Sequence, residues 1–277
     1  MSVIGFVPNA TLRRARNACL LLGLCMQLSP DAQAAPFAVR YTEGTVHGFL
    51  ALRTKDGKTL ASGTLTQRVR GNRVVGRLTF HFKDGSLDEE ETTYLQRPIL
   101  QLIRYHHVQS GPTFPHPSDV SLDVAAGIVT VRSTEDGQSR EKTSHLELTP
   151  ELGNGLLINV LKNLPVRIDS PVTELQCVIA TPAPRIVTLE IRRGDEETFE
   201  SAGSELRARR YDIAIKLGGV AGVVAPLVGK APEDVHVWIV EGIAPAFVRM
   251  DGQLFAEGPI WTIELANPQW RGPPPRS

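Results

Sequence analysis

The chain has 277 residues, of which 30 are basic, 30 are acidic and 42% are hydrophobic. This even charge balance excludes a protein that attracts nucleic acid or anionic lipid through its net field. Three cysteines are too few for a scaffold held by several disulfides. We therefore expect a domain that is stabilised by a hydrophobic core.

Residues 1–34 have the order of a secretory signal peptide. Three arginines at positions 13, 14 and 16 precede an apolar run over residues 18–26, which is too short to remain as a membrane anchor. Ala32 and Ala34 then supply the small residues that a signal peptidase accepts, so the sequence predicts cleavage after Ala34. The mature protein would be exported to the periplasm or the extracellular space, with no stable membrane anchor.

The remaining chain is predicted to form a β domain over residues 35–267 and a disordered, Pro-rich tail over residues 268–277. A weak sub-boundary falls near residues 165–171. Removal of the signal peptide takes away three arginines and Asp31, leaving 27 basic and 29 acidic residues and a net charge of about −2. Cys177 is then the one cysteine left, so no intramolecular disulfide is expected.

Hydrophobic residues alternate with polar ones over several segments, which is typical of half-buried strands. The alternating apolar sets are Val74, Leu78, Phe80 and Phe82; Tyr211, Ile213, Ile215 and Leu217; and Trp261, Ile263 and Leu265. Asp-Gly pairs at positions 56–57, 84–85, 136–137 and 251–252 predict hairpin turns. The sequence thus predicts an all-β, mainly antiparallel meander that curls into a half-barrel or barrel.

One segment, residues 149–164, is predicted to be helical. Thr149 can cap its start, and Pro150 suits the first helical position. Apolar residues recur at every fourth position from Leu152 to Leu164, and Pro165 ends the pattern. We expect this apolar stripe to pack on the sheet.

Four stretches, at residues 43–50, 81–87, 109–115 and 218–230, together resemble an uncharacterised family of exported bacterial proteins. The resemblance covers nearly all of the mature chain and implies no assigned activity. The plan of a long meander interrupted by a helix is also similar to the curled half-barrels of periplasmic lipoprotein carriers of the Lol type. That second likeness concerns architecture alone.

The densest set of candidate metal ligands consists of His106, His107, His116 and Asp119. Neighbours on a strand point to opposite faces, so His106 and His107 cannot both reach one ion without a bulge. We therefore expect solvated or hydrogen-bonded histidines, and no metal or other cofactor.

Two further features suggest chemistry less strongly. The acidic run at residues 88–91 could supply a general acid and base, but a row of carboxylates more often forms a solvated strand edge. Cys177 lies in an apolar run at residues 175–179. We expect it to be a buried, unreactive thiol rather than a nucleophile.

The uncharged segment at residues 218–229 is too apolar to face water as a whole, so it is either packed core or a lid over an apolar cavity. In the second case Lys230 would mark the polar rim, and Trp238 and Trp261 would line the cavity. The candidate ligand-binding residues are Val220, Val223, Val224, Leu227, Lys230, Trp238 and Trp261.

The leading hypothesis is non-enzymatic binding of an apolar or amphipathic, lipid-like molecule of the cell envelope. An envelope structural or protein-interaction module that uses an exposed sheet edge is the alternative. A metal-assisted hydrolase centred on His106, His107, His116 and Asp119 comes third. A large apolar cavity would favour the first hypothesis, and a filled core with a long open edge the second.

Overall fold

The computed structural model describes residues 36–135, 138–165, 172–180, 183–201, 204–216 and 234–266. All of them belong to one compact unit, Ala34–Ser277. The predicted signal peptide, the tail, the segment at residues 218–229 and most of the predicted sub-boundary lie outside the described residues. Within the described ranges, no helix is long and apolar enough to cross a bilayer.

Fourteen strands of the described chain form one antiparallel sheet, in the order β8-β7-β6-β5-β4-β3-β2-β1-β14-β13-β12-β11-β10-β9. This confirms the predicted all-β meander. The elements are β1 (Val46–Thr54), β2 (Thr59–Arg70), β3 (Arg73–Phe82), β4 (Leu87–Leu95), β5 (Gln101–Ser110), β6 (Ser118–Asp123), β7 (Ile128–Glu135), β8 (Gln138–His145), α1 (Leu157–Asn163), β9 (Val172–Ile179), β10 (Arg185–Ser201), β11 (Ser204–Ile215), β12 (Val235–Val240), β13 (Ala246–Gly252) and β14 (Trp261–Leu265).

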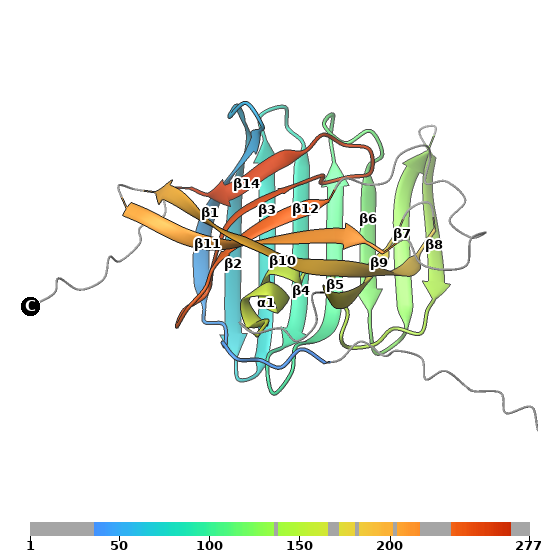
Figure 1. The fold of residues 1–277 in the computed structure, drawn as a ribbon. Coiled ribbons are helices and arrows are strands. Elements are labelled where there is room, and N and C mark those ends of the chain that lie inside the picture. The colour runs from blue at the N-terminus through green and yellow to red at the C-terminus, as the bar shows by residue number, and fades with distance from the viewer. Residues whose placement is uncertain are drawn as a thin grey trace, which may run out of the picture. The chain divides into compact units, whose positions relative to one another are not determined.

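The sheet curls so that its second half faces its first. In Figure 1, β1 to β8 stand side by side and β9 to β14 cross in front of them, with α1 between. One core cluster accordingly combines buried residues of β3 to β7 with others of α1 and β9 to β12. A second core cluster joins β1, β2 and β3 to β14. The interior is therefore the concave face of a single curled sheet.

Two of the predicted Asp-Gly turns are confirmed, because Gly57 and Gly85 both have a φ of 86° between consecutive strands. The pair at residues 136–137 lies outside the described residues. The turn predicted at Asp251-Gly252 is wrong: Asp251 pairs with Thr262, and Gly252 with Trp261, inside the β13–β14 ladder. An Asp-Gly pair permits a turn without requiring one, and here the pairing of the strands overrides the local preference.

The predicted helix is shorter than expected, since α1 covers only Leu157–Asn163. The preceding residues form turns that press against two strands. Gly155 has a φ of 67°, and a Cβ there would lie 1.9 Å from Thr92 Oγ1; a Cβ on Gly153 would lie 2.5 Å from Leu175. The positive φ of Gly155 interrupts the helix, and the close approach of Thr92 and Leu175 requires glycine at both positions. The apolar stripe is nevertheless in the core, with Leu152, Leu156 and Val160 each 1% exposed and Leu164 7% exposed.

Candidate functional site

Of the four candidate metal ligands, the structure brings only His106 and Asp119 together. His106 lies on the outer face, where its Nε2 is 2.8 Å from Asp119 Oδ1. His107 points inward, where its Nε2 is 3.3 Å from Asp88 Oδ2, and His116 is exposed in the β5–β6 loop. No group of three His, Cys, Asp or Glu residues suited to a metal ion occurs among the described residues. The alternation of side chains along β5 accounts for the separation.

The two candidate tryptophans lie on different faces of the sheet. Trp261 lies in the interior, where its ring centroid is 5.8 Å from Phe82 and 5.9 Å from Phe255. Trp238 packs on the outer face, in a small cluster with Ala208 and Val248, and Arg249 covers its ring at 5.3 Å. Trp238 therefore does not line the concave interior. The role of the segment at residues 218–229 and of Lys230 stays a prediction.

Cys177 is buried on the concave face, as part of the main core cluster. Burial raises the pKa of its thiol to about 12, so the nucleophilic thiolate is scarce at neutral pH. This environment agrees with the interpretation of Cys177 as a small core residue.

The acidic run at residues 88–91 divides between the two faces of β4. Glu89 and Glu91 point outward and form ion pairs with Arg77, at 3.9 and 2.6 Å. Asp88, by contrast, is buried, and Glu90 accepts a hydrogen bond from Tyr105 of the interior face, at 3.0 Å. The expected solvated edge is therefore wrong for Asp88 and Glu90, because β4 is a central strand with one face in the core.

These inward residues form a set that we call the acid–histidine cluster: Asp88, Glu90, Tyr105, His107 and Gln109. Gln109 Nε2 donates to Asp88 Oδ2 at 2.7 Å and to the carbonyl of Leu254 at 2.8 Å. It thus ties β4 and β5 to the β13–β14 loop. The cluster joins the two halves of the sheet through polar contacts.

The protonation of this cluster is shifted by its surroundings. Desolvation raises the pKa of Glu90, although the charge of His107 opposes the rise. Desolvation also lowers the pKa of His107, but the hydrogen bond and charge of Asp88 and the charge of Glu90 outweigh it, so the net pKa of His107 is raised. The neighbouring carboxylates thus favour the protonated form of His107, and burial favours the protonated form of Glu90.

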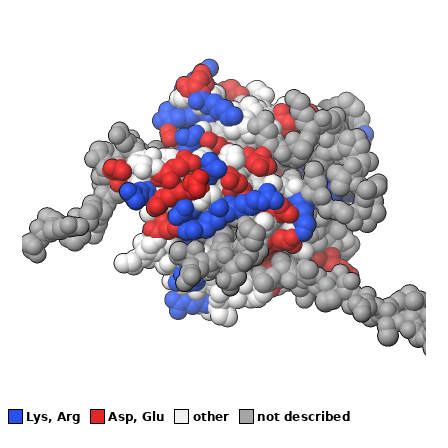
Figure 2. Space-filling view, viewed as in Figure 1, with Lys and Arg blue, Asp and Glu red and all other residues white. Residues whose placement is uncertain are grey.

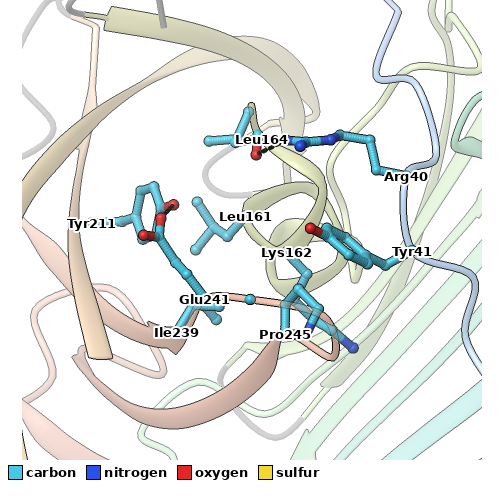
Figure 3. Close-up of a pocket in the computed structure, with 10 residues that line it drawn as sticks. Arg40, Tyr41, Leu161, Lys162, Leu164, Tyr211, Ile239, Glu241 and Pro245 are labelled. Atoms are coloured by element: carbon cyan, nitrogen blue, oxygen red, sulfur yellow. Dashed lines mark hydrogen bonds between the residues drawn. The ribbon is translucent and has the colours of Figure 1, made fainter. Parts of the chain in front are cut away.

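A pocket opens at a different place, between the start of the described chain, α1 and the β12–β13 turn (Figure 3). We call it the mouth pocket. Figure 3 shows Tyr211 and Glu241 on one side and Arg40 and Tyr41 on the other, with Leu161 between them. Its volume is about 20 Å³, which is room for one water-sized group. It is lined by Arg40, Tyr41, Leu161, Lys162, Leu164, Tyr211, Ile239, Glu241, Gly242 and Pro245.

Helix α1 positions the first half of the mouth pocket. Asn163 Oδ1 accepts hydrogen bonds from the backbone N–H groups of Arg40 and Tyr41, at 2.7 and 2.8 Å. Arg40 Nη1 donates to the carbonyl of Leu164 at 2.9 Å, and Lys162 Nζ donates to Glu43 at 2.6 Å. Arg40 is therefore held where a helix leaves its last carbonyls unpaired.

Strands β10 to β12 supply the second half. Glu241 accepts hydrogen bonds from Arg193 Nη2 at 2.7 Å and from the Tyr211 hydroxyl at 3.0 Å. Arg209 Nε lies 3.5 Å from the same carboxylate. Desolvation would raise the pKa of Glu241, but the hydrogen bonds from Arg193 and Tyr211 outweigh it and lower the pKa. Desolvation and the charge of Glu241 raise the pKa of Tyr211 to about 12.

Positive charge is in excess around the mouth pocket. The basic residues are Arg40, Lys162, Arg193 and Arg209, and the acidic ones are Glu43 and Glu241. In addition, the buried Nε–H group of Arg193 has no hydrogen-bond partner among the described residues, and that of Arg209 has only the 3.5 Å ion-pair contact with Glu241. Arg193 and Arg209 do not line the pocket themselves, so they act on it through their positive charge beside Glu241.

The outer face of β9 to β14 differs from the mouth pocket, because basic and acidic side chains alternate there (Figure 2). Arg210 pairs with Asp212 at 3.0 Å, and Arg249 with Asp251 at 2.7 Å. Arg192–Glu190 and Lys216–Glu174 are further pairs. This mutual neutralisation leaves little field to attract a charged ligand.

Sequence reasoning missed the mouth pocket, because its residues come from distant parts of the chain, from Arg40 to Pro245. The signals that could have indicated it are the pair Arg40-Tyr41, shortly after the predicted cleavage site, and a basic position, Lys162, in the predicted helix. Neither feature is specific by itself.

The fold and its pocket define a curled antiparallel β protein that holds a short helix in its concave face. No family model and no curated protein matches the sequence. Among solved structures, the fold is similar to the crystal structure of a beta-barrel-like protein of domain of unknown function DUF1849 from Brucella abortus. The TM-score is 0.43 and the identity 10%, over 81% of this chain and 98% of that chain. No function is carried over from this likeness.

Proposed function

We propose that the protein is a non-enzymatic binding protein of the cell envelope, which holds the anionic end of an amphipathic molecule at the mouth pocket. The observation that carries the proposal is the two-sided wall of this pocket. Leu161, Leu164, Ile239 and Pro245 form its apolar side, and Arg40, Lys162, Tyr41, Tyr211 and Glu241 form its polar side. Arg193 and Arg209 offset the charge of Glu241. Such a combination suits a ligand that is both apolar and charged.

The described interior limits how such a ligand can bind. Buried side chains of α1 and of the residues before it occupy the space between the two halves of the sheet. A pocket of about 20 Å³ admits one oxygen atom of an anionic group and no hydrocarbon chain. The ligand would therefore insert its anionic group among the basic side chains, and its apolar part would lie outside.

The β12–β13 turn offers a contact for that apolar part. Ile243 is 99% exposed, and its neighbours Gly242 and Pro245 line the mouth pocket. Covering a fully exposed isoleucine stabilises a complex by about 25 cal/mol for each Å² of apolar surface that is removed from water. Ile243 is thus suited to contact a chain that leaves the pocket.

A fluorescent fatty-acid probe tests the proposal. Wild-type protein should bind it saturably, with a stoichiometry near one. Replacement of Ile243 by Ser should weaken binding about five-fold, which corresponds to loss of part of one apolar contact. Phe49→Ser is the matched control, since Phe49 is 58% exposed and does not line the pocket.

Equal binding by Ile243→Ser and wild type, or equal loss in both variants, would contradict a specific role for this turn. No saturable binding by wild type would remove the proposal itself. The predicted lid at residues 218–229 can be tested in the same assay with Leu227→Asp.

A further inference from the structure

The two edge strands of the sheet, β9 and β8, differ in whether other described residues cover them. At one edge, Gly153 N–H donates to the carbonyl of Gln176 in β9 at 2.7 Å. The side-chain amide of Asn154 then exchanges two hydrogen bonds with the backbone of Val178, at 2.8 and 2.9 Å. Residues 153–154 thus cover the outer edge of β9 in the manner of an added strand.

The other edge is β8, which pairs with β7 alone in the described part of the chain. Seven of its eight side chains are exposed and one is half-buried. No residue of β8 belongs to a core cluster of the described residues. Burial therefore does not explain why this segment is a regular strand of eight residues.

The register of β7 and β8 shows which backbone groups of β8 face outward. Leu146 N–H donates to the carbonyl of Gly127 at 2.9 Å, so these two residues form a hydrogen-bonded pair. The next pair, Ile128 and His145, is then non-hydrogen-bonded. Hydrogen-bonded and non-hydrogen-bonded pairs alternate along an antiparallel ladder. The outward N–H and C=O groups are consequently those of Ser139, Glu141, Thr143 and His145.

The charged side chains of β8 indicate which kind of strand can pair with this edge. On the outer face, His106, Asp119, Arg132 and Glu141 form a row across β5 to β8, with contacts of 2.8, 3.5 and 2.6 Å. The row ends on the carboxylate of Glu141, so a basic side chain would continue it. The next residue, Lys142, is exposed on the opposite face and would favour an acidic neighbour.

A second copy of the chain fits poorly. Two identical antiparallel edges that continue one sheet pair residues of the same face, so a two-fold axis passes through one residue position. The two registers with the longest overlap then place Glu141 against Glu141, or Lys142 against Lys142. Like charges in direct opposition destabilise such a pair.

We propose that β8 is a docking edge for an extended segment of a different protein, which adds to the sheet as an antiparallel strand. The segment carries a basic residue opposite Glu141 and an acidic residue opposite Lys142. Main-chain hydrogen bonds to Ser139, Glu141 and Thr143 hold it, and the two charges set its register. This surface is distinct from the mouth pocket and does not depend on the proposed ligand.

A pair of capped eight-residue peptides tests the proposal. Both are threonine-rich and differ in the order of one Lys and one Glu at the two central positions. The matched peptide has Glu before Lys, which in an antiparallel strand places Glu opposite Lys142 and Lys opposite Glu141, and the reversed peptide has Lys before Glu. The matched peptide should protect the amide protons of Glu141 and Thr143 from exchange, as measured by nuclear magnetic resonance. The reversed peptide should bind about five-fold or more weakly, since two charge pairs become repulsive.

The double variant Glu141→Lys/Lys142→Glu should reverse this preference. Thr143→Pro removes one outward N–H without touching a bond to β7, so it should abolish binding of both peptides while the fold is retained. If neither peptide protects β8, or if the charge-swapped variant keeps the wild-type preference, the proposal fails. Sedimentation that shows a dimer dissociated by Thr143→Pro would assign the edge to a second copy and overturn it as well.

Discussion

The mouth pocket and the acid–histidine cluster both place carboxylates inside the curled sheet, but they give them different partners. Glu241 meets Arg193 and Arg209, whose charge does not change with pH. Glu90 meets a tyrosine hydroxyl and lies near His107, which titrates. The arginines of the mouth pocket therefore stay positively charged as the pH changes, whereas the charge of the acid–histidine cluster changes with pH.

The largest difference in the free energy of unfolding is expected when one glutamate in each region is replaced by glutamine. Glu241→Gln leaves two arginines facing each other and should lower the free energy of unfolding by about 2 kcal/mol. This is less than the 3–5 kcal/mol of fully buried pairs, because the side chains of Arg193 and Glu241 are 24% and 27% exposed. Glu90→Gln removes a carboxyl group whose charged form the interior disfavours, so at pH 8 it should be neutral or stabilising by up to about 1 kcal/mol.

Urea unfolding of the two variants beside wild type measures both effects. Destabilisation of similar size by both substitutions would contradict the distinction between a paired and a disfavoured carboxylate. A stabilised Glu241→Gln variant would show that the arginines do not depend on this acid.

A smaller difference in the free energy of unfolding is expected between variants of two neighbouring residues on β5. His107→Gln weakens a contact to buried Asp88 and should cost about 1–2 kcal/mol, as for other hydrogen bonds to charged groups. His106→Gln breaks a pair whose side chains are 46% and 32% exposed. It should change the free energy of unfolding by less than about 0.5 kcal/mol. Equal effects in thermal or urea unfolding would contradict the assignment of the two histidines to opposite faces.

The pH dependence of stability should have opposite signs in the two regions. The pKa values of Glu90 and His107 are raised in the folded protein, from ordinary values of 4.5 and 6.5. Their contributions are therefore complete below those values and are lost as the pH rises through the folded pKa values. The pKa of Glu241 is lowered from 4.5, so its contribution is present above pH 4.5 and is lost as the pH falls through the folded value.

Urea midpoints between pH 3 and pH 9 measure these slopes. Glu90→Gln and His107→Gln should flatten the decline of stability toward high pH, and Glu241→Gln should flatten the decline toward low pH. A wild-type decline toward high pH that persists unchanged in both cluster variants would assign it to other groups.

Much of the fold could be predicted from the sequence, because alternation is a local signal. Val74, Phe80 and Phe82 are buried as their spacing along β3 predicts. The separation of His106 and His107 follows from the same rule. The start of α1 could not be predicted, since it depends on contacts of Gly153 and Gly155 with strands that are distant in sequence.

The candidate sites were harder to predict than the strands. The acidic run was expected at a solvated edge, but the pairing of β4 between β3 and β5 turns Asp88 and Glu90 inward. The mouth pocket depends on the docking of Arg40 beside α1 and on the β12–β13 turn. Such contacts arise from the curvature of the sheet, which no short stretch of sequence encodes.

The central claim is that the mouth pocket binds an anionic group of an amphipathic ligand. Calorimetric titration with dodecyl phosphate and with dodecyl maltoside, both below their micelle concentrations, tests it most directly. Dodecyl phosphate should bind with a stoichiometry near one and about ten-fold more tightly than the maltoside, through charge-assisted hydrogen bonds. The preference should disappear in Arg40→Gln and persist in Arg104→Gln, whose side chain is 67% exposed in wild type and lies outside the pocket. Equal affinity for the two ligands, or a preference that survives in Arg40→Gln, would contradict the claim.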